Sequence, residues 1–117
     1  MLVASTSLSG TTCSVRIKCE DSDDAVQITS GTDHNGRTST TAYSDWTVPV
    51  MTAGTEYESA DFTTALQEVI DRAGWTSGNA IHVFISNNAS SYNGVRLVSS
   101  LENTSYTEAE LIVTYTT

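Results

Sequence analysis

Four carboxylates lie close together in the stretch EDSDD, at Glu20, Asp21, Asp23 and Asp24. Carboxylate oxygens are ligands that Ca²⁺ prefers in proteins. The stretch lacks the glycine and the terminal glutamate of an EF-hand loop. We therefore expect a solvated acidic turn and no cofactor, with a structural Ca²⁺ ion as the alternative.

A second group of polar residues surrounds one aromatic ring in NNASSYNGVR, namely Tyr92 with Asn88, Asn93 and Arg96. A tyrosine ring stacks on the apolar face of a sugar, while amide groups take its hydroxyls. Loops at the end of a β-sandwich often carry binding residues. These four residues are the candidate contacts with a ligand or partner, and a polar turn with one exposed tyrosine is the alternative.

Two arginines, Arg37 and Arg72, could bind a ligand that carries a carboxylate. We favour ion pairs within the chain, with Asp45, Glu68 or Asp71 as partners.

Two histidines stand in different settings. His82 lies in the apolar stretch AIHVFIS, where we expect a packing residue with its polar atoms satisfied. His34 lies among Gly and Asn, where we expect a solvated side chain.

Two cysteines alternate with polar residues in the stretch CSVRIKC, so Cys13 and Cys19 belong to one apolar face of a strand. Six residues of strand separate them by roughly 20 Å, which is too far for a disulfide. We expect two buried free thiols in the core.

No catalytic motif stands out. The chain has no Gly-x-Ser-x-Gly elbow, no phosphate-binding loop and no Cys/His metal spacing. Acidic residues are numerous, but no pair is marked as a glycosidase dyad. We expect a protein that is not an enzyme.

The elements that would position these residues are mainly strands. Period-two patterns bounded by Gly, Asn and Asp predict strands at residues 2–7, 12–20, 25–30, 38–43, 80–86, 95–99 and 110–115.

Residues 62–72 instead follow helical spacing, with Asp61 as the N-terminal cap and Gly74 after the C-terminus. The predicted core contains tryptophans, cysteines and the helix stripe: Trp46, Trp75, Cys13, Cys19, Leu66, Val69 and Ile70.

Composition excludes some partners. The chain has 117 residues, a formal net charge of −9 and only five basic residues, which are scattered. We expect no nucleic-acid partner and no membrane insertion, because phosphate recognition needs clustered cations and no long apolar run is present. Ser and Thr make up roughly 30% of the chain, a polar composition that favours a virion-surface or extracellular location. The N-terminus does not read as a signal peptide.

Residues 20–115 resemble the C-terminal part of DNRLRE-like β-sandwich modules, which occur in secreted bacterial and marine phage proteins and look like jelly-roll carbohydrate-binding domains. The resemblance rests first on an acidic pair before an extended strand, as in EDSDDAVQI. It rests also on three groups of residues: Arg37, Thr40 or Thr41, Ala42 and Trp46; then Asp61, Phe62, Gln67, Glu68, Val69, Ile70, Arg72, Trp75, Gly78, Asn79 and Ala80; and finally Ile112, Val113 and Tyr115. Ala73 replaces a proline of the pattern. The family module has further N-terminal strands, so this sandwich is either minimal or completed by another chain.

Residues and resemblance together predict one domain over residues 1–117, an all-β jelly-roll sandwich with one amphipathic helix covering an end. The expected function is a structural or adhesive surface module that assembles with neighbouring subunits, such as a phage decoration, tail or fibre protein. A glycan-binding module is the alternative.

Overall fold

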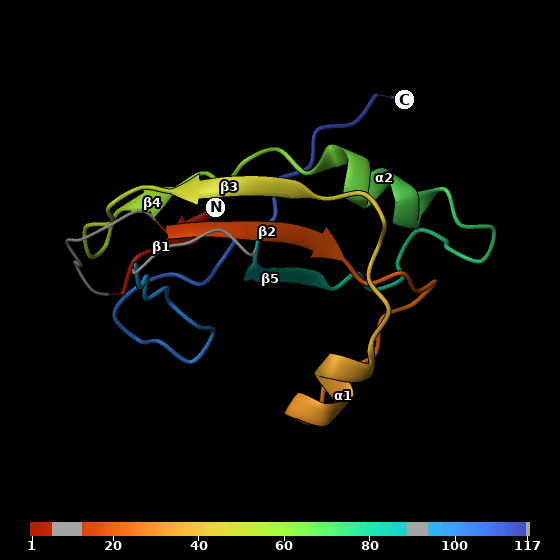
Figure 1. The fold of residues 1–117 in the computed structure, drawn as a ribbon, viewed down its shortest axis with the longest axis horizontal. Coiled ribbons are helices and arrows are strands. Elements are labelled where there is room, and N and C mark those ends of the chain that lie inside the picture. The colour runs from red at the N-terminus through yellow and green to blue at the C-terminus, as the bar shows by residue number, and fades with distance from the viewer. Residues whose placement is uncertain (6–12, 89–93, 117) are drawn as a thin grey trace. The chain divides into compact units, whose positions relative to one another are not determined.

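Strands dominate the regular structure of the chain (Figure 1). The computed structural model describes residues 1–5, 13–88 and 94–116. Its elements are, in chain order, β1 (Leu2–Val3), β2 (Cys13–Cys19), α1 (Gly31–Gly36), β3 (Ser44–Val48), β4 (Glu56–Tyr57), α2 (Thr63–Ile70) and β5 (Val83–Asn87). The strands form antiparallel sheets of two and three strands, so the predicted β-rich class is confirmed.

The chain divides into two compact units. Unit 1 comprises Met1–Ser14, Thr47–Ser59 and Ser90–Thr117, and unit 2 comprises Val15–Trp46 and Ala60–Ala89.

Unit 1 contains the two-stranded sheet, in which Leu2 of β1 faces Tyr57 of β4. An isolated bridge joins Ala4 to Val98, and the Ser99 N–H donates to the Val3 carbonyl at 2.8 Å. The buried apolar residues of unit 1 are Val3, Ala4, Cys13, Val48 and Met51.

Strand β2 is the central strand of the three-stranded sheet, in the order β3–β2–β5. Its alternation buries one face, on which Cys13, Ile17 and Cys19 are at most 7% exposed. Both cysteines are free, so the predictions of a strand at residues 12–20 and of two buried thiols are confirmed.

Helix α2 packs its apolar stripe against the end of β2. Ala65, Val69 and Cys19 are fully buried and form one cluster. The half-buried side chains packed around this cluster are Ala42, Phe62, Leu66, Trp75 and Ile81. The predicted helix is confirmed with shorter ends. Its cap position is Phe62, one residue after the predicted Asp61, and the Asp61 carboxylate still accepts the Thr63 N–H at 2.7 Å.

The predicted core is confirmed in most positions. Trp46, Val69 and the two cysteines are buried. Leu66, Ile70 and Trp75 are only half-buried, because α2 has two turns and turns only part of its stripe inward. The indole Nε1 of Trp75 is shielded from solvent, and it has no hydrogen-bond partner in the part of the chain described.

The expectation of a single helix is wrong, because residues 31–36 form the short helix α1. Ser30 caps it, since its hydroxyl oxygen accepts the Asp33 N–H at 3.1 Å. The sequence GTDHNG suggests a turn because glycine and asparagine weaken helices. Here the cap stabilises the first turn, where the free N–H groups lie.

Several predicted strands are absent. Residues 25–30, 38–43 and 110–115 carry no strand, and residues 95–99 contribute only the bridge at Val98. The strand expected before Trp46 is displaced to β3. A period-two pattern describes a chain that suits a pleated sheet, whereas a strand also needs a neighbouring strand to pair with.

Candidate functional site

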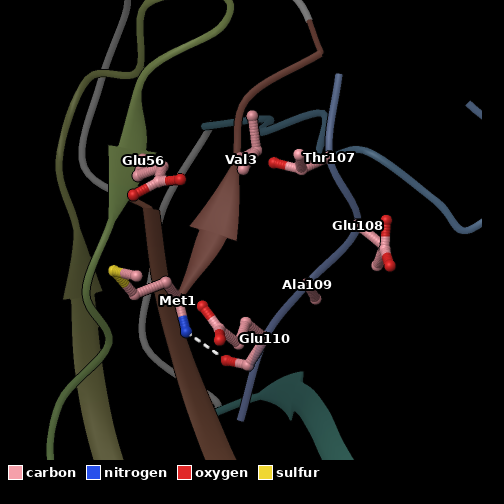
Figure 2. A pocket seen from close by; sticks show the side chains of 7 residues that line it. All are labelled: Met1, Val3, Glu56, Thr107, Glu108, Ala109 and Glu110. Carbon is pink, nitrogen blue, oxygen red and sulfur yellow. Dashed lines mark hydrogen bonds between the residues drawn. The ribbon is translucent and has the colours of Figure 1, made fainter. Parts of the chain in front are cut away.

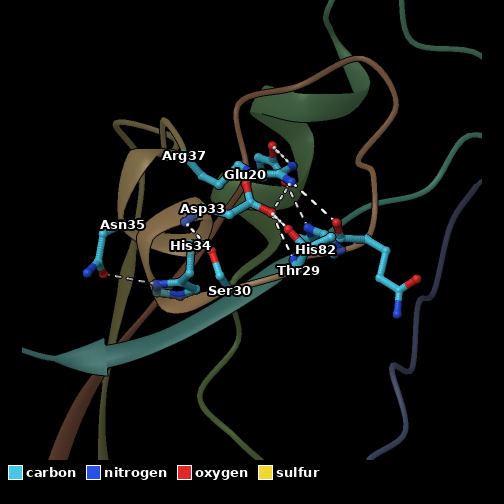
Figure 3. A network of polar contacts seen from close by, with 9 residues as sticks. Glu20, Thr29, Ser30, Asp33, His34, Asn35, Arg37 and His82 are labelled. Atoms are coloured by element: carbon cyan, nitrogen blue, oxygen red, sulfur yellow. Dashed lines mark hydrogen bonds and ion pairs between the residues drawn. The ribbon is translucent and has the colours of Figure 1, made fainter.

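Glu20 is the most buried carboxylate among the described residues, with 7% of its surface exposed. Its Oε1 accepts a hydrogen bond from Arg37 at 2.9 Å, and its Oε2 lies 2.8 Å from His82 Nδ1 (Figure 3). Arg37 also contacts Asp33 at 2.7 and 3.1 Å. These four residues are called the Glu20 cluster.

Local sequence explains half of this cluster. Asp33 lies in α1, and Arg37 follows it four residues later, so both side chains fall on the same side of the chain. Two hydrogen bonds, first from Arg37 and then from the Thr29 N–H, hold the pKa of Asp33 far below its usual range. The same contact with Asp33, followed by that with Glu20, raises the pKa of Arg37.

Tertiary structure provides the other half. The Glu20 N–H donates to the His82 carbonyl at 2.9 Å, which brings the end of β2 beside the start of β5. The His82 ring lies 6.2 Å from the Phe84 ring, and the exposed His34 meets the same ring edge-on at 5.2 Å. His82 therefore has its polar and aromatic partners inside unit 2, as predicted for a packing residue.

The other three predicted metal ligands also have protein partners. Arg72 contacts Asp23 at 2.6 Å and also pairs with Asp21, and these contacts, led by Asp23, raise its pKa. Asp24 accepts the Ala80 N–H at 2.8 Å.

The four acidic side chains of EDSDD therefore turn to different protein partners. A Ca²⁺ ion needs about six to eight oxygens converging on one point. Among residues 1–5, 13–88 and 94–116, no group of three or more His, Cys, Asp or Glu residues is arranged to hold a metal ion. What these carboxylates do in the structure is to connect β2, the following loop and the end of α2.

The ion-pair partners predicted for the two arginines are wrong. Asp45 pairs with Arg16 through two hydrogen bonds of 2.8 and 2.9 Å, which lower the pKa of Asp45. The Arg16 guanidinium also lies 3.7 Å from the centre of the Tyr43 ring.

Glu68 serves the backbone instead of an arginine. It accepts the N–H groups of Ala42 and Thr41, each at 2.8 Å, and these bonds lower its pKa. The partners of these carboxylates are far apart in sequence, which is why spacing alone could not identify them.

The predicted loop contacts are only partly described. Tyr92 and Asn93 lie outside the described residues, and Asn88 is half-buried. Arg96 donates to the carbonyls of Pro49 at 2.7 Å and Val95 at 2.9 Å. This arginine holds two segments of unit 1 together.

A pocket of about 320 Å³ opens in unit 1 between β1, β4 and residues 107–110 (Figure 2). The Met1 ammonium donates to the Glu110 carbonyl, and the Glu110 N–H donates to the Met1 carbonyl at 2.9 Å. These two bonds anchor the chain at Glu110.

Beyond this anchor the chain exposes apolar side chains. We call residues 111–115 the C-terminal segment; its apolar members Leu111, Ile112, Val113 and Tyr115 are 47–78% exposed. In unit 2, Val83 and Ile85 of β5 are 36% and 49% exposed. The sequence predicted both stretches as strands but gave no sign that their apolar residues would be exposed to solvent.

No protein-family model matches the chain, and neither a curated protein nor a solved structure was found to resemble it. In the described part of the chain, neither helix is long and apolar enough to cross a bilayer.

Proposed function

We propose that this chain is a non-enzymatic structural module of a particle surface, and that it works by packing against neighbouring protein subunits. A phage virion component, such as a capsid decoration, tail or fibre protein, has this role. The observation that carries the proposal is the exposed apolar surface of unit 1.

In the described part of unit 1, nine large apolar side chains are at least 44% exposed, against five buried apolar residues. The nine are Val50, Val95, Leu97, Val98, Leu101, Leu111, Ile112, Val113 and Tyr115. Single exposed apolar residues are normal, but a concentration in one small unit is typical of a surface that a partner covers.

The charge of the chain supports a protein partner. Unit 1 has five glutamates and a single arginine, Arg96, whose guanidinium is bound to backbone carbonyls. Nothing in this composition favours a phosphate backbone, which is recognised by clustered cations.

The resemblance to jelly-roll modules supports a sandwich as the complete fold. The two antiparallel sheets and the packing of α2 on Cys19, through Ala65 and Val69, are compatible with such an architecture. A sandwich that is completed by neighbours would bury the apolar residues that one copy leaves exposed.

The test is the native mass of the purified chain, measured by light scattering over a hundredfold range of concentration, with thermal melts at each concentration. We expect a defined oligomer that dissociates on dilution, and a melting temperature that rises with protein concentration. A monomer with a cooperative, concentration-independent melt would contradict the proposal and direct the next experiment to a glycan array, with Tyr92→Ala as the variant.

A further inference from the structure

Strand β5 lies at one edge of the three-stranded sheet, and no strand of residues 1–5, 13–88 or 94–116 pairs with its outer side, which we call the open edge. The hydrogen bond from the Glu20 N–H to the His82 carbonyl identifies the hydrogen-bonded pairs of this antiparallel ladder. Pairs alternate, so Phe84 and Ser86 direct their backbone groups to β2. The N–H and C=O groups of Val83 and Ile85 therefore point to the open side.

The side chains at this edge continue the buried face of the sheet. Val83 is opposite Cys19 and Ile85 is opposite Ile17, and opposite residues share a face. Cys19 and Ile17 are 0% and 1% exposed, whereas Val83 and Ile85 remain open to solvent. The apolar face thus extends past β2 to the edge without being covered there.

Natural edge strands are protected by charged residues, proline or a bulge. β5 has the sequence Val-Phe-Ile-Ser-Asn, without a charge or a proline. In a chain with 19 charged residues, this uncharged edge offers both free hydrogen-bonding groups and apolar side chains.

The same chain contains a stretch that suits this edge. The C-terminal segment, Leu-Ile-Val-Thr-Tyr, is as long as β5, is uncharged and consists almost wholly of residues that favour strands. It carries no strand in the structure, and every one of its five residues is exposed. In an extended conformation, Leu111, Val113 and Tyr115 fall on one face.

We propose that the open edge of β5 accepts the C-terminal segment of a second copy of this chain as an added strand. Leu111, Val113 and Tyr115 of the donor then cover Val83 and Ile85 of the acceptor, and backbone hydrogen bonds fix the register. This inference rests on the proposed function and names the partner surface.

Each copy carries one donor segment and one acceptor edge, so the contact joins two different surfaces. Such a contact gives either a closed reciprocal pair or a continuing chain of subunits. Each copy has a net charge of −9, so added salt should tighten the association by screening repulsion between copies.

The experiment compares the full chain with Ile85→Lys, which alters the acceptor edge, and Val113→Lys, which alters the donor segment. Val26→Lys is the matched control, since Val26 is 63% exposed, lies in unit 2 and belongs to neither surface. Ile85 and Val113 are 49% and 47% exposed, so the substitutions leave the fold of one copy intact. Circular dichroism and melts verify this.

We expect each of these two variants alone to weaken self-association by at least about tenfold, and Val26→Lys to leave it unchanged. An equimolar mixture of Ile85→Lys and Val113→Lys should restore a dimer of one copy each. The intact edge of the second variant receives the intact segment of the first, and the remaining altered pair blocks further growth.

A wild-type oligomer that both variants leave intact, or a mixture that stays monomeric, would overturn the strand exchange while leaving the proposed function in place. A wild-type chain that is monomeric at every concentration and salt would overturn both.

Discussion

The two units distribute their charged and apolar side chains differently. The five arginine–carboxylate ion pairs of the described structure and the His82–Glu20 contact all lie in unit 2, as do both helices. Unit 2 exposes four large apolar side chains, at Val26, Tyr43, Val83 and Ile85, against the nine of unit 1.

This difference shows which unit has more of its interactions within the described chain. In unit 2, a helix covers the end of the central strand, and arginines connect loops that are far apart in sequence. In unit 1, short two-residue strands hold a small core, and the C-terminal segment lacks a strand partner within the described structure. A second subunit would therefore add more to unit 1 than to unit 2.

The largest difference between the two units should appear in the free energy of unfolding that is lost when one large apolar side chain is truncated to alanine. Trp46→Ala removes an 8%-exposed indole from unit 2 and should lower the free energy of unfolding by about 3–5 kcal/mol. Leu101→Ala in unit 1, at a residue 75% exposed, should change it by less than about 0.5 kcal/mol in the monomer. Urea unfolding measures both, and equal costs would remove the contrast between the units.

A smaller effect is expected from the Glu20 cluster. Glu20→Gln keeps the shape of the side chain but removes the charge that Arg37 and His82 contact, and should cost about 2–3 kcal/mol. Asp45→Asn is the control, since it breaks a pair of similar length at the surface. Its cost should be too small to resolve, because solvent screens exposed pairs. If Glu20→Gln and Asp45→Asn lower the free energy of unfolding equally, then the burial of Glu20 does not strengthen its contacts with Arg37 and His82.

The smallest effect is the response to acid. The pKa values of Asp33 and Glu68 are lowered in the folded chain, so unfolded chains bind protons more readily. The stability that these carboxylates contribute is complete above their ordinary pKa of about 4 and is lost as pH falls through the lower folded values. The double variant Asp33→Asn, Glu68→Gln should flatten this acid-induced decline in melts from pH 6 to pH 2. An unaltered slope in the variant would show that other groups cause it, and Glu102→Gln is the exposed control.

The spacing of apolar residues within one segment was enough to predict β2 and α2. The alternation of Cys13, Ile17 and Cys19 placed β2, and the stripe containing Ala65 and Val69 placed α2, because one period fits one buried face. Helix α1 was missed, although Ser30 and Asp33 have the spacing of a cap and Asp33 and Arg37 the spacing of a helical ion pair.

The site could not be predicted in the same way. Arg37 meets Glu20 across 17 residues, and His82 meets Glu20 across 62. Sequence separation of this size leaves many carboxylates available to each cation, and the fold selects among them. The same limit applies to the C-terminal segment. Its residues favour a strand, but its sequence does not identify the strand with which it would pair.

Because Cys19 is buried at the end of β2, its reaction with an alkylating reagent can report the opening of that strand. Burial raises the pKa of this thiol to about 11, so at pH 8 on the order of one molecule in a thousand carries the reactive thiolate. An alkylating reagent therefore reacts with Cys19 chiefly in molecules whose central strand has opened. The rate at which Cys19 is alkylated therefore measures how often the strand opens. We expect this rate to fall when assembly with other subunits keeps the sheet closed.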